Sequence, residues 1–177
     1  MSYFKILYFY ALIISCNLFS QTTGSRTIGI TLPVVALMDI EPAGITTLNF
    51  TAPTEAGRPI IAPTSNTSKW INYTSAITQG GVSRRITASI NQVLPGINVR
   101  IQAANSSGAG GGILGTSTGQ ITLTTTAQTI ISGIGGAFTG NGANNGHRLT
   151  ISLSSNTYSN LSARTNTPIV ITYTITE

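Results

Sequence analysis

Few side chains in this sequence could carry acid–base, nucleophilic or metal chemistry. The 177 residues include one histidine, His147, one cysteine, Cys16, and four carboxylates. Asp39 and Glu41 could in principle act as an acid/base pair or ligate a hard cation. Because they flank the end of an apolar run, we expect them instead to end a strand in solvent. A hydrolase needs a base beside a nucleophile, so this sparse set predicts no enzyme, no metal site and no cofactor.

Two glycine-rich stretches, 105–119 and 133–147, have the composition of surface loops. Gly110, Gly112 and Gly115 match the spacing of a dinucleotide-binding turn, but that turn must lead from a strand into a helix. No helical periodicity follows them. The second stretch contains no carboxylate, so it is not a conventional calcium loop. We therefore expect two exposed loops of the kind that carries recognition.

The positive charge of the chain does not indicate a nucleic-acid partner. The formal charge of +5 arises because acids are scarce, and the nine bases are scattered. Arg84 and Arg85 are adjacent, but neighbouring residues of a strand point to opposite faces. A nucleic-acid groove needs a concentrated basic patch. Neutral hydroxyls and amides supply most of the polarity, which suits a β-rich extracellular surface.

Three aromatic residues, Trp70, Tyr73 and Phe138, are the candidate contacts for a surface glycan. In an expected strand over 69–74, Ile71 and Tyr73 share one face and Trp70 lies on the other. An outward Trp70 would stack on a sugar ring, whereas an inward Trp70 would fill the core. We expect core packing, because a lone tryptophan without neighbouring aromatics makes a poor binding platform.

Apolar residues with a period of two predict strands throughout the chain and no helix. Ile169, Ile171, Tyr173 and Ile175 alternate with polar or smaller residues after Pro168, which predicts a central strand with one buried face.

Other apolar patterns predict further short strands. The continuous apolar run 34–40 predicts a strand buried on both sides, and 82–91 with 96–103 predicts a hairpin. The inward-facing residues of this hairpin are expected to be Ile86, Ala88 and Ile90 on one strand and Ile97, Val99 and Ile101 on the other. Additional strands are expected over 26–32, 45–50, 120–125, 128–132 and 147–154. Short strands separated by turns predict a single antiparallel immunoglobulin-like Greek-key β-sandwich over 22–177.

The N-terminal residues 1–21 have the pattern of a signal peptide. Their apolar run, Ile6–Ile14, is too short to span a bilayer. The segment Ile13-Ile14-Ser15-Cys16 resembles a bacterial lipobox, in which Cys16 becomes lipidated. The alternative is ordinary cleavage near Ser20 or Gln21. Both predict export to the bacterial outer surface, with membrane contact only through a lipid anchor at Cys16.

The two ends of the chain resemble those of a known group of proteins. The opening RTIGITLPVVALMDIEPAG and the ending NTYSNLSARTNTPIVITYTITE look like the first and last strands of bacterial fimbrial-subunit and spore-coat-U-like domains. Tyr158-Ser159 and Ile169–Thr176 match the closing pattern of those families. The cysteine pair found in many of them is absent here.

This resemblance implies a non-enzymatic structural or adhesive surface protein, such as a fimbria- or filament-like pilus subunit. In such subunits one chain lends a strand to the next. Thr22–Leu32 is the candidate donor, with Ile28, Ile30 and Leu32 as its inserted side chains. The alternative is that this segment pairs as an edge strand within its own domain. Expected partners are copies of the same chain, other surface subunits or surface glycans. The alternative function is a soluble or lipid-anchored carbohydrate-binding module.

Overall fold

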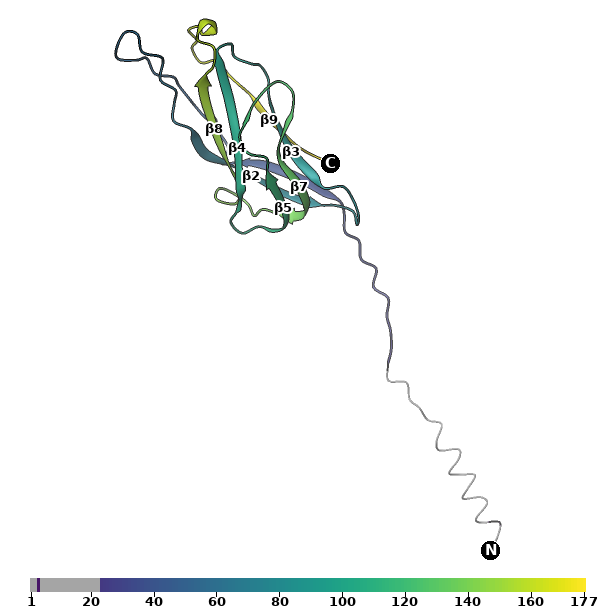
Figure 1. Ribbon diagram of the computed structural model, residues 1–177. Helices are drawn as coiled ribbons and strands as arrows, with labels where there is room; N and C mark the ends of the chain where they lie inside the picture. Colours follow the sequence, from purple (N-terminus) through teal and green to yellow (C-terminus); the bar gives the residue numbers. More distant parts are fainter. Residues whose placement is uncertain (1–2, 4–22) are drawn as a thin grey trace. The chain divides into compact units, whose positions relative to one another are not determined.

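The computed structural model describes residue 3 and residues 23–177 of the chain (Figure 1). It divides the chain into two units, Met1–Leu32 and Pro33–Glu177. Apart from residue 3, the predicted signal peptide lies outside the described residues, and so does Cys16. Both remain predictions.

The second unit is all-β and antiparallel, as the alternating apolar pattern predicts. A short 3-10 helix, η2 (Tyr158–Asn160), precedes the last strand. The strands are β1 (Val35–Glu41), β2 (Asn66–Ala76), β3 (Arg84–Ile90), β4 (Ile97–Ser107), β5 (Gly111–Ser117), β6 (Ile121–Thr122), β7 (Gln128–Phe138), β8 (Gly146–Ser155) and β9 (Ile171–Thr176).

The strand order is β6-β4-β8-β2-β7-β3-β9, with β1 paired to β2 and β5 paired to β7. The predicted hairpin of 82–91 with 96–103 is wrong, because β3 pairs with β7 and β9 while β4 pairs with β6 and β8. A period-two pattern determines which face of a strand is buried but does not determine its neighbours. The pairing therefore could not be read from these two segments alone.

The strands share one hydrophobic core. Its buried members come from β2, β3, β4, β7 and β8 together with Leu123, and partly buried side chains of β6 and β9 pack against them. The inward faces predicted for β3 and β4 are confirmed at five positions and not at the sixth: Ile97, at the start of β4, is only partly buried. The five buried residues are Ile86, Ala88, Ile90, Val99 and Ile101. The buried cluster consists of Ile71, Tyr73, Ile86, Ala88, Ile90, Val99, Ile101, Ala103, Leu123, Ile130, Ile131, Ile134, Ala137, Leu149 and Ile151.

Both glycine-rich stretches contain strand, so the prediction that they are entirely surface loop is wrong. β5 lies within 105–119, and β7 continues into 133–147 as far as Phe138. Gly112 explains why: its φ of 88° favours glycine, and a Cβ there would lie 2.2 Å from the Gly136 carbonyl oxygen. Glycine here allows two backbones to approach closely.

The two ends of the domain differ most from expectation. β9 pairs with β3 alone among the described residues, so it is an edge strand and not a central one. β1 is not buried on both sides, since Leu37 is 66% exposed. The segment 45–50 forms no strand, and 23–34 has neither helix nor strand. An apolar run shows that a segment can form a strand, but whether it does so and how deeply it is buried depend on the strands that lie beside it.

Candidate functional site

β2 and β3 occupy the same edge of β7, one after the other. β3 pairs with β7 as far as Ile134, and the end of β2 pairs Thr74 and Ser75 with Phe138 and Ala137. β5 pairs with the same part of β7 and therefore takes its other edge. All these pairings are antiparallel, so β2 and β3 run in the same direction along β7.

β3 and β2 each have one more strand on the side away from β7, namely β9 and β1. β9 pairs with the outer edge of β3, and β1 pairs with the outer edge of β2. β9 and β1 therefore run in the same direction and lie end to end along the outer edge of the sheet. In the described part of the chain neither has a second strand partner. We call this line the β9–β1 edge, which is Ile171–Thr176 followed by Val35–Glu41.

The β9–β1 edge leaves apolar side chains incompletely covered. Ile171, Tyr173 and Ile175 of β9 pack against the core together with Met38 and Ile40 of β1, but all five are only partly buried. An edge strand also presents backbone N–H and C=O groups without partners. The β9–β1 edge therefore has both features that an added strand would use: backbone groups to pair with and apolar side chains to cover.

A buried arginine holds the junction of the β9–β1 edge. Arg84 is 4% exposed and donates hydrogen bonds to the Val35 carbonyl oxygen of β1 and to Ser75 Oγ of β2, the latter at 3.1 Å. Its guanidinium also lies 3.6 Å from the carboxylate of Glu177, which follows β9. Arg85 is exposed on the opposite face, as predicted. Arg84 thus ties the start of β1 to the end of the chain.

A second buried cation holds the chain just beyond β1. Lys69 is 8% exposed, and its Nζ donates hydrogen bonds to the carbonyl oxygens of Pro42 at 2.6 Å and Gly44 at 2.8 Å. Contacts at both ends thus place β1 beside β2.

The only histidine lies in the core. His147 is 0% exposed, and its ring stacks on that of Tyr73 with centroids 5.8 Å apart. Nδ1 donates to the Ala104 carbonyl oxygen at 2.9 Å, while Nε2 lies 3.1 Å from the Tyr73 hydroxyl and 3.2 Å from the Leu114 carbonyl oxygen. Burial raises the pKa of the Tyr73 phenol above its usual value. Both nitrogens of His147 are engaged inside the fold, which gives the side chain a structural role.

Burial of two tyrosines predicts a loss of stability at high pH. Burial raises the pKa of Tyr73 and of Tyr173 above the usual 10.0. Below that pH both tyrosines are neutral in both states, whereas above it the unfolded chain loses protons that the folded chain keeps. The free energy of unfolding should therefore fall as the pH rises above 10.0. Urea unfolding across this range measures the slope, and Tyr173→Phe should reduce it.

The three candidate glycan contacts do not form one platform. Tyr73 is 3% exposed, and Trp70 lies on the opposite face of β2, half-buried between Glu41 and Arg148 in register. Trp70 is also outside the buried core cluster of the described residues, so its expected core packing is wrong. Ile71 and Tyr73 take the inner face of β2 instead. Phe138, at the end of β7, is 53% exposed.

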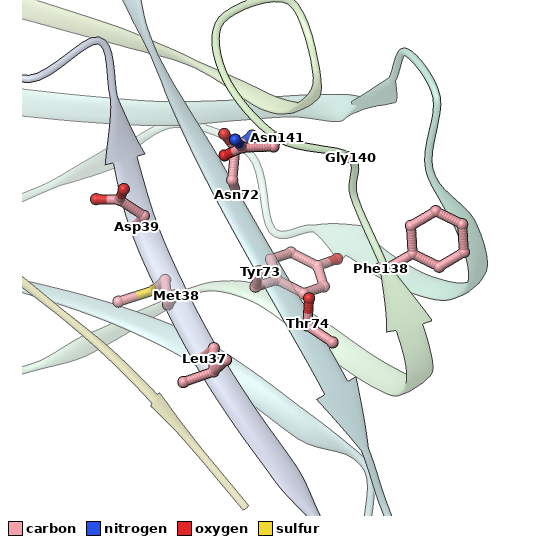
Figure 2. Close-up of a pocket in the computed structure, with 9 residues that line it drawn as sticks. All are labelled: Leu37, Met38, Asp39, Asn72, Tyr73, Thr74, Phe138, Gly140 and Asn141. Atoms are coloured by element: carbon pink, nitrogen blue, oxygen red, sulfur yellow. The ribbon is translucent and has the colours of Figure 1, made fainter.

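Phe138 borders an open pocket of about 450 Å³, which we call the Phe138 pocket (Figure 2). β1, β2, the end of β7 and the chain that follows it contribute to it. Sequence reasoning identified Phe138 and Tyr73 but missed the polar members, because they come together only through the strand register. The lining residues are Leu37, Met38, Asp39, Asn72, Tyr73, Thr74, Phe138, Gly140 and Asn141.

Internal hydrogen bonds hold the loop 139–146, which forms one wall of this pocket. Asn145 Oδ1 accepts from the Ala109 amide at 2.9 Å, and Asn145 Nδ2 donates to the Asn141 carbonyl oxygen at 2.8 Å. Thr139 is 0% exposed, and its Oγ1 accepts from the Tyr73 amide at 2.9 Å. The loop therefore has a defined shape despite its glycine- and asparagine-rich composition.

The remaining candidates give no further site. Asp39 is exposed at β1, and its Oδ1 accepts a hydrogen bond from the Ile40 amide at 2.7 Å. Within residues 3 and 23–177, no group of three or more His, Cys, Asp or Glu side chains could hold a metal ion. Among the same residues, no helix has the length and apolar character needed to cross a membrane.

The candidate donor residues are strongly exposed. Ile28, Ile30 and Leu32 are 81%, 88% and 83% exposed, in a stretch with neither helix nor strand. Their role as inserted side chains stays a prediction.

Compared with protein-family models, with curated proteins and with solved structures, the chain matches none. The functional argument therefore rests on its own residues.

Proposed function

We propose that this chain is an exported, non-enzymatic subunit of a bacterial surface structure, built on an immunoglobulin-like Greek-key sandwich. In this proposal it assembles with copies of itself by strand addition. The signal-peptide pattern and the hydroxyl-rich composition support export. The observation that carries the proposal is the β9–β1 edge, where partly buried apolar side chains lie on strands that have no second strand partner within residues 23–177.

The occupant of the β9–β1 edge is the segment Thr22–Leu32 of another copy. In an extended strand, Ile28, Ile30 and Leu32 lie on one face, where they would cover the partly buried side chains of β9 and β1. Main-chain hydrogen bonds would give affinity, and the alternate side chains would give specificity. β9 and β1 have six and seven residues, a span that suits this segment.

We expect the donor to run antiparallel to the β9–β1 edge, because all the described ladders of this domain are antiparallel. In that direction the start of the donor segment lies beside β1 and Leu32 lies toward β9.

The first experiment compares the chain starting at Thr22 with one starting at Thr31, by size-exclusion chromatography with light scattering and by electron microscopy. We expect the longer chain to polymerise and the shorter one to stay monomeric. A stable, cooperative monomer from the longer chain would contradict the proposal.

Substitutions within the donor segment give a sharper prediction. Ile28→Asp with Ile30→Asp should weaken assembly on the order of 100-fold or more, because charged side chains would enter an apolar site. Thr27→Asp with Thr31→Asp adds the same charge on the opposite face of the strand and should preserve most of the assembly. Light scattering against concentration measures both. Equal loss in the two variants would show that charge, and not insertion, controls assembly.

A further inference from the structure

We propose that the Phe138 pocket binds a neutral oligosaccharide. This inference does not depend on strand addition, because the pocket contains no residue of β9 and its test uses a chain that lacks most of the donor segment.

One row of the pocket suits the apolar face of a sugar. Leu37, Thr74 and Phe138 lie opposite one another across three adjacent strands, so their side chains share one face. Leu37 and Phe138 are 66% and 53% exposed. An exposed aromatic ring with an aliphatic neighbour can pack against the C–H groups of a pyranose. Thr74 between them offers a hydroxyl to the ring substituents.

The next row supplies hydrogen-bonding groups. Asp39 lies opposite Asn72, and Asn141 reaches the pocket from the loop. Asn72 is 5% exposed, and its Nδ2 donates to the Asn145 carbonyl oxygen at 2.7 Å. Its Oδ1 is buried and has no hydrogen-bond partner among the described residues. A buried acceptor without a partner is rare and costly, and a rotation of the Asn72 side chain, which lines the pocket, would let a ligand hydroxyl satisfy it.

The chemistry and size of the pocket select a neutral, extended ligand. Its lining includes one carboxylate and no base, which disfavours phosphates and acidic sugars. In Figure 2 the Asp39 carboxylate and the Phe138 ring lie at opposite ends, with the two asparagines and Thr74 between them. Asp39 and Phe138 lie on β1 and β7, which are separated by β2, so the two strands are about 10 Å apart. An open site of this length suits a short oligosaccharide that stays partly hydrated.

The loop that forms one wall supports the same conclusion. The Asn145 contacts hold the Asn141 backbone in place. Ligand binding would therefore cost little conformational entropy in that wall.

The test titrates the chain starting at Thr31, which the proposed assembly leaves monomeric, with maltotriose, triacetylchitotriose and lactose, followed by NMR amide shifts, with sialyllactose as the acidic counterpart of lactose. We expect binding of at least one neutral sugar with a Kd on the order of 1 mM or tighter, with shifts confined to the pocket. If lactose binds, sialyllactose should bind more weakly. Absence of binding by all three neutral sugars, or shifts elsewhere on the domain, would overturn the proposal.

Two pocket variants and one control locate the site. Phe138→Ala should weaken binding about tenfold and Asn141→Ala about threefold, since each removes one contact from an exposed side chain. Val82→Ala, at a 68% exposed residue outside the pocket, should leave binding unchanged. Thermal unfolding confirms that each variant folds. Unchanged affinity in both pocket variants would refute the assignment.

Discussion

Replacement of His147 with alanine is expected to lower the free energy of unfolding by about 3–5 kcal/mol. The ring is completely buried, so its loss leaves a cavity beside Tyr73. It also leaves the Ala104 carbonyl oxygen without the donor now 2.9 Å away. Both effects act at the point where β2, β4, β5 and β8 meet, and urea denaturation measures their sum.

The neighbouring residue provides the control for His147. Arg148→Ala changes the next side chain, which is exposed on the other face of β8, and should alter stability by less than about 0.5 kcal/mol. Tyr73→Phe combined with His147→Ala should show a coupling of about 0.5–3 kcal/mol, as expected for residues in contact. A His147→Ala effect as small as that of Arg148→Ala would contradict a structural role for the ring.

The second large effect is expected from Arg84→Ala, at about 2–4 kcal/mol. The substitution leaves the Val35 carbonyl oxygen and Ser75 Oγ without their donor and removes the contact with Glu177. We therefore expect the start of β1 and the end of β9 to loosen together. Hydrogen exchange at these two segments should accelerate more than in β8.

Arg85→Ala is the matched control, because it removes the same charge from the exposed face of the same strand. It should change stability by less than about 0.5 kcal/mol. If the two arginine variants behave alike, net charge explains the effect, and Arg84 does not organise the junction.

Much of the local structure follows from the sequence. The alternation in 69–74 correctly puts Tyr73 and Trp70 on opposite faces of one strand, although the buried face is that of Tyr73 and not, as expected, that of Trp70. The alternation in 82–91 and 96–103 identifies most of the buried residues of β3 and β4. These predictions succeed because the side-chain direction in a strand has a period of two wherever the strand lies.

Strand neighbours could not be predicted in the same way. The alternation in Ile169–Ile175 is equally compatible with a central strand and with an edge, and only its pairing with β3 alone in the described chain distinguishes them. The glycines of 105–119 suggest a loop, yet several of them allow β5 to approach β7 closely. Strand order depends on contacts distant in sequence, which a single strand's pattern does not contain.

The Phe138 pocket was predictable only in part. Phe138 is conspicuous in a glycine-rich stretch, but Asp39, Asn72 and Asn141 join it through the register of β1 with β2 and through the loop held by Asn145. No spacing in the sequence relates these residues.

The most direct test of strand addition is hydrogen exchange in the chain starting at Thr31, with and without a synthetic peptide of residues 22–32. We expect the peptide to protect amides of β9 and β1, because an added strand pairs the free backbone groups of the β9–β1 edge. Exchange in β4 and β8 should not change, and a peptide carrying Ile28→Asp and Ile30→Asp should give no protection. Unchanged exchange in β9 and β1 at saturating peptide would contradict the proposed assembly.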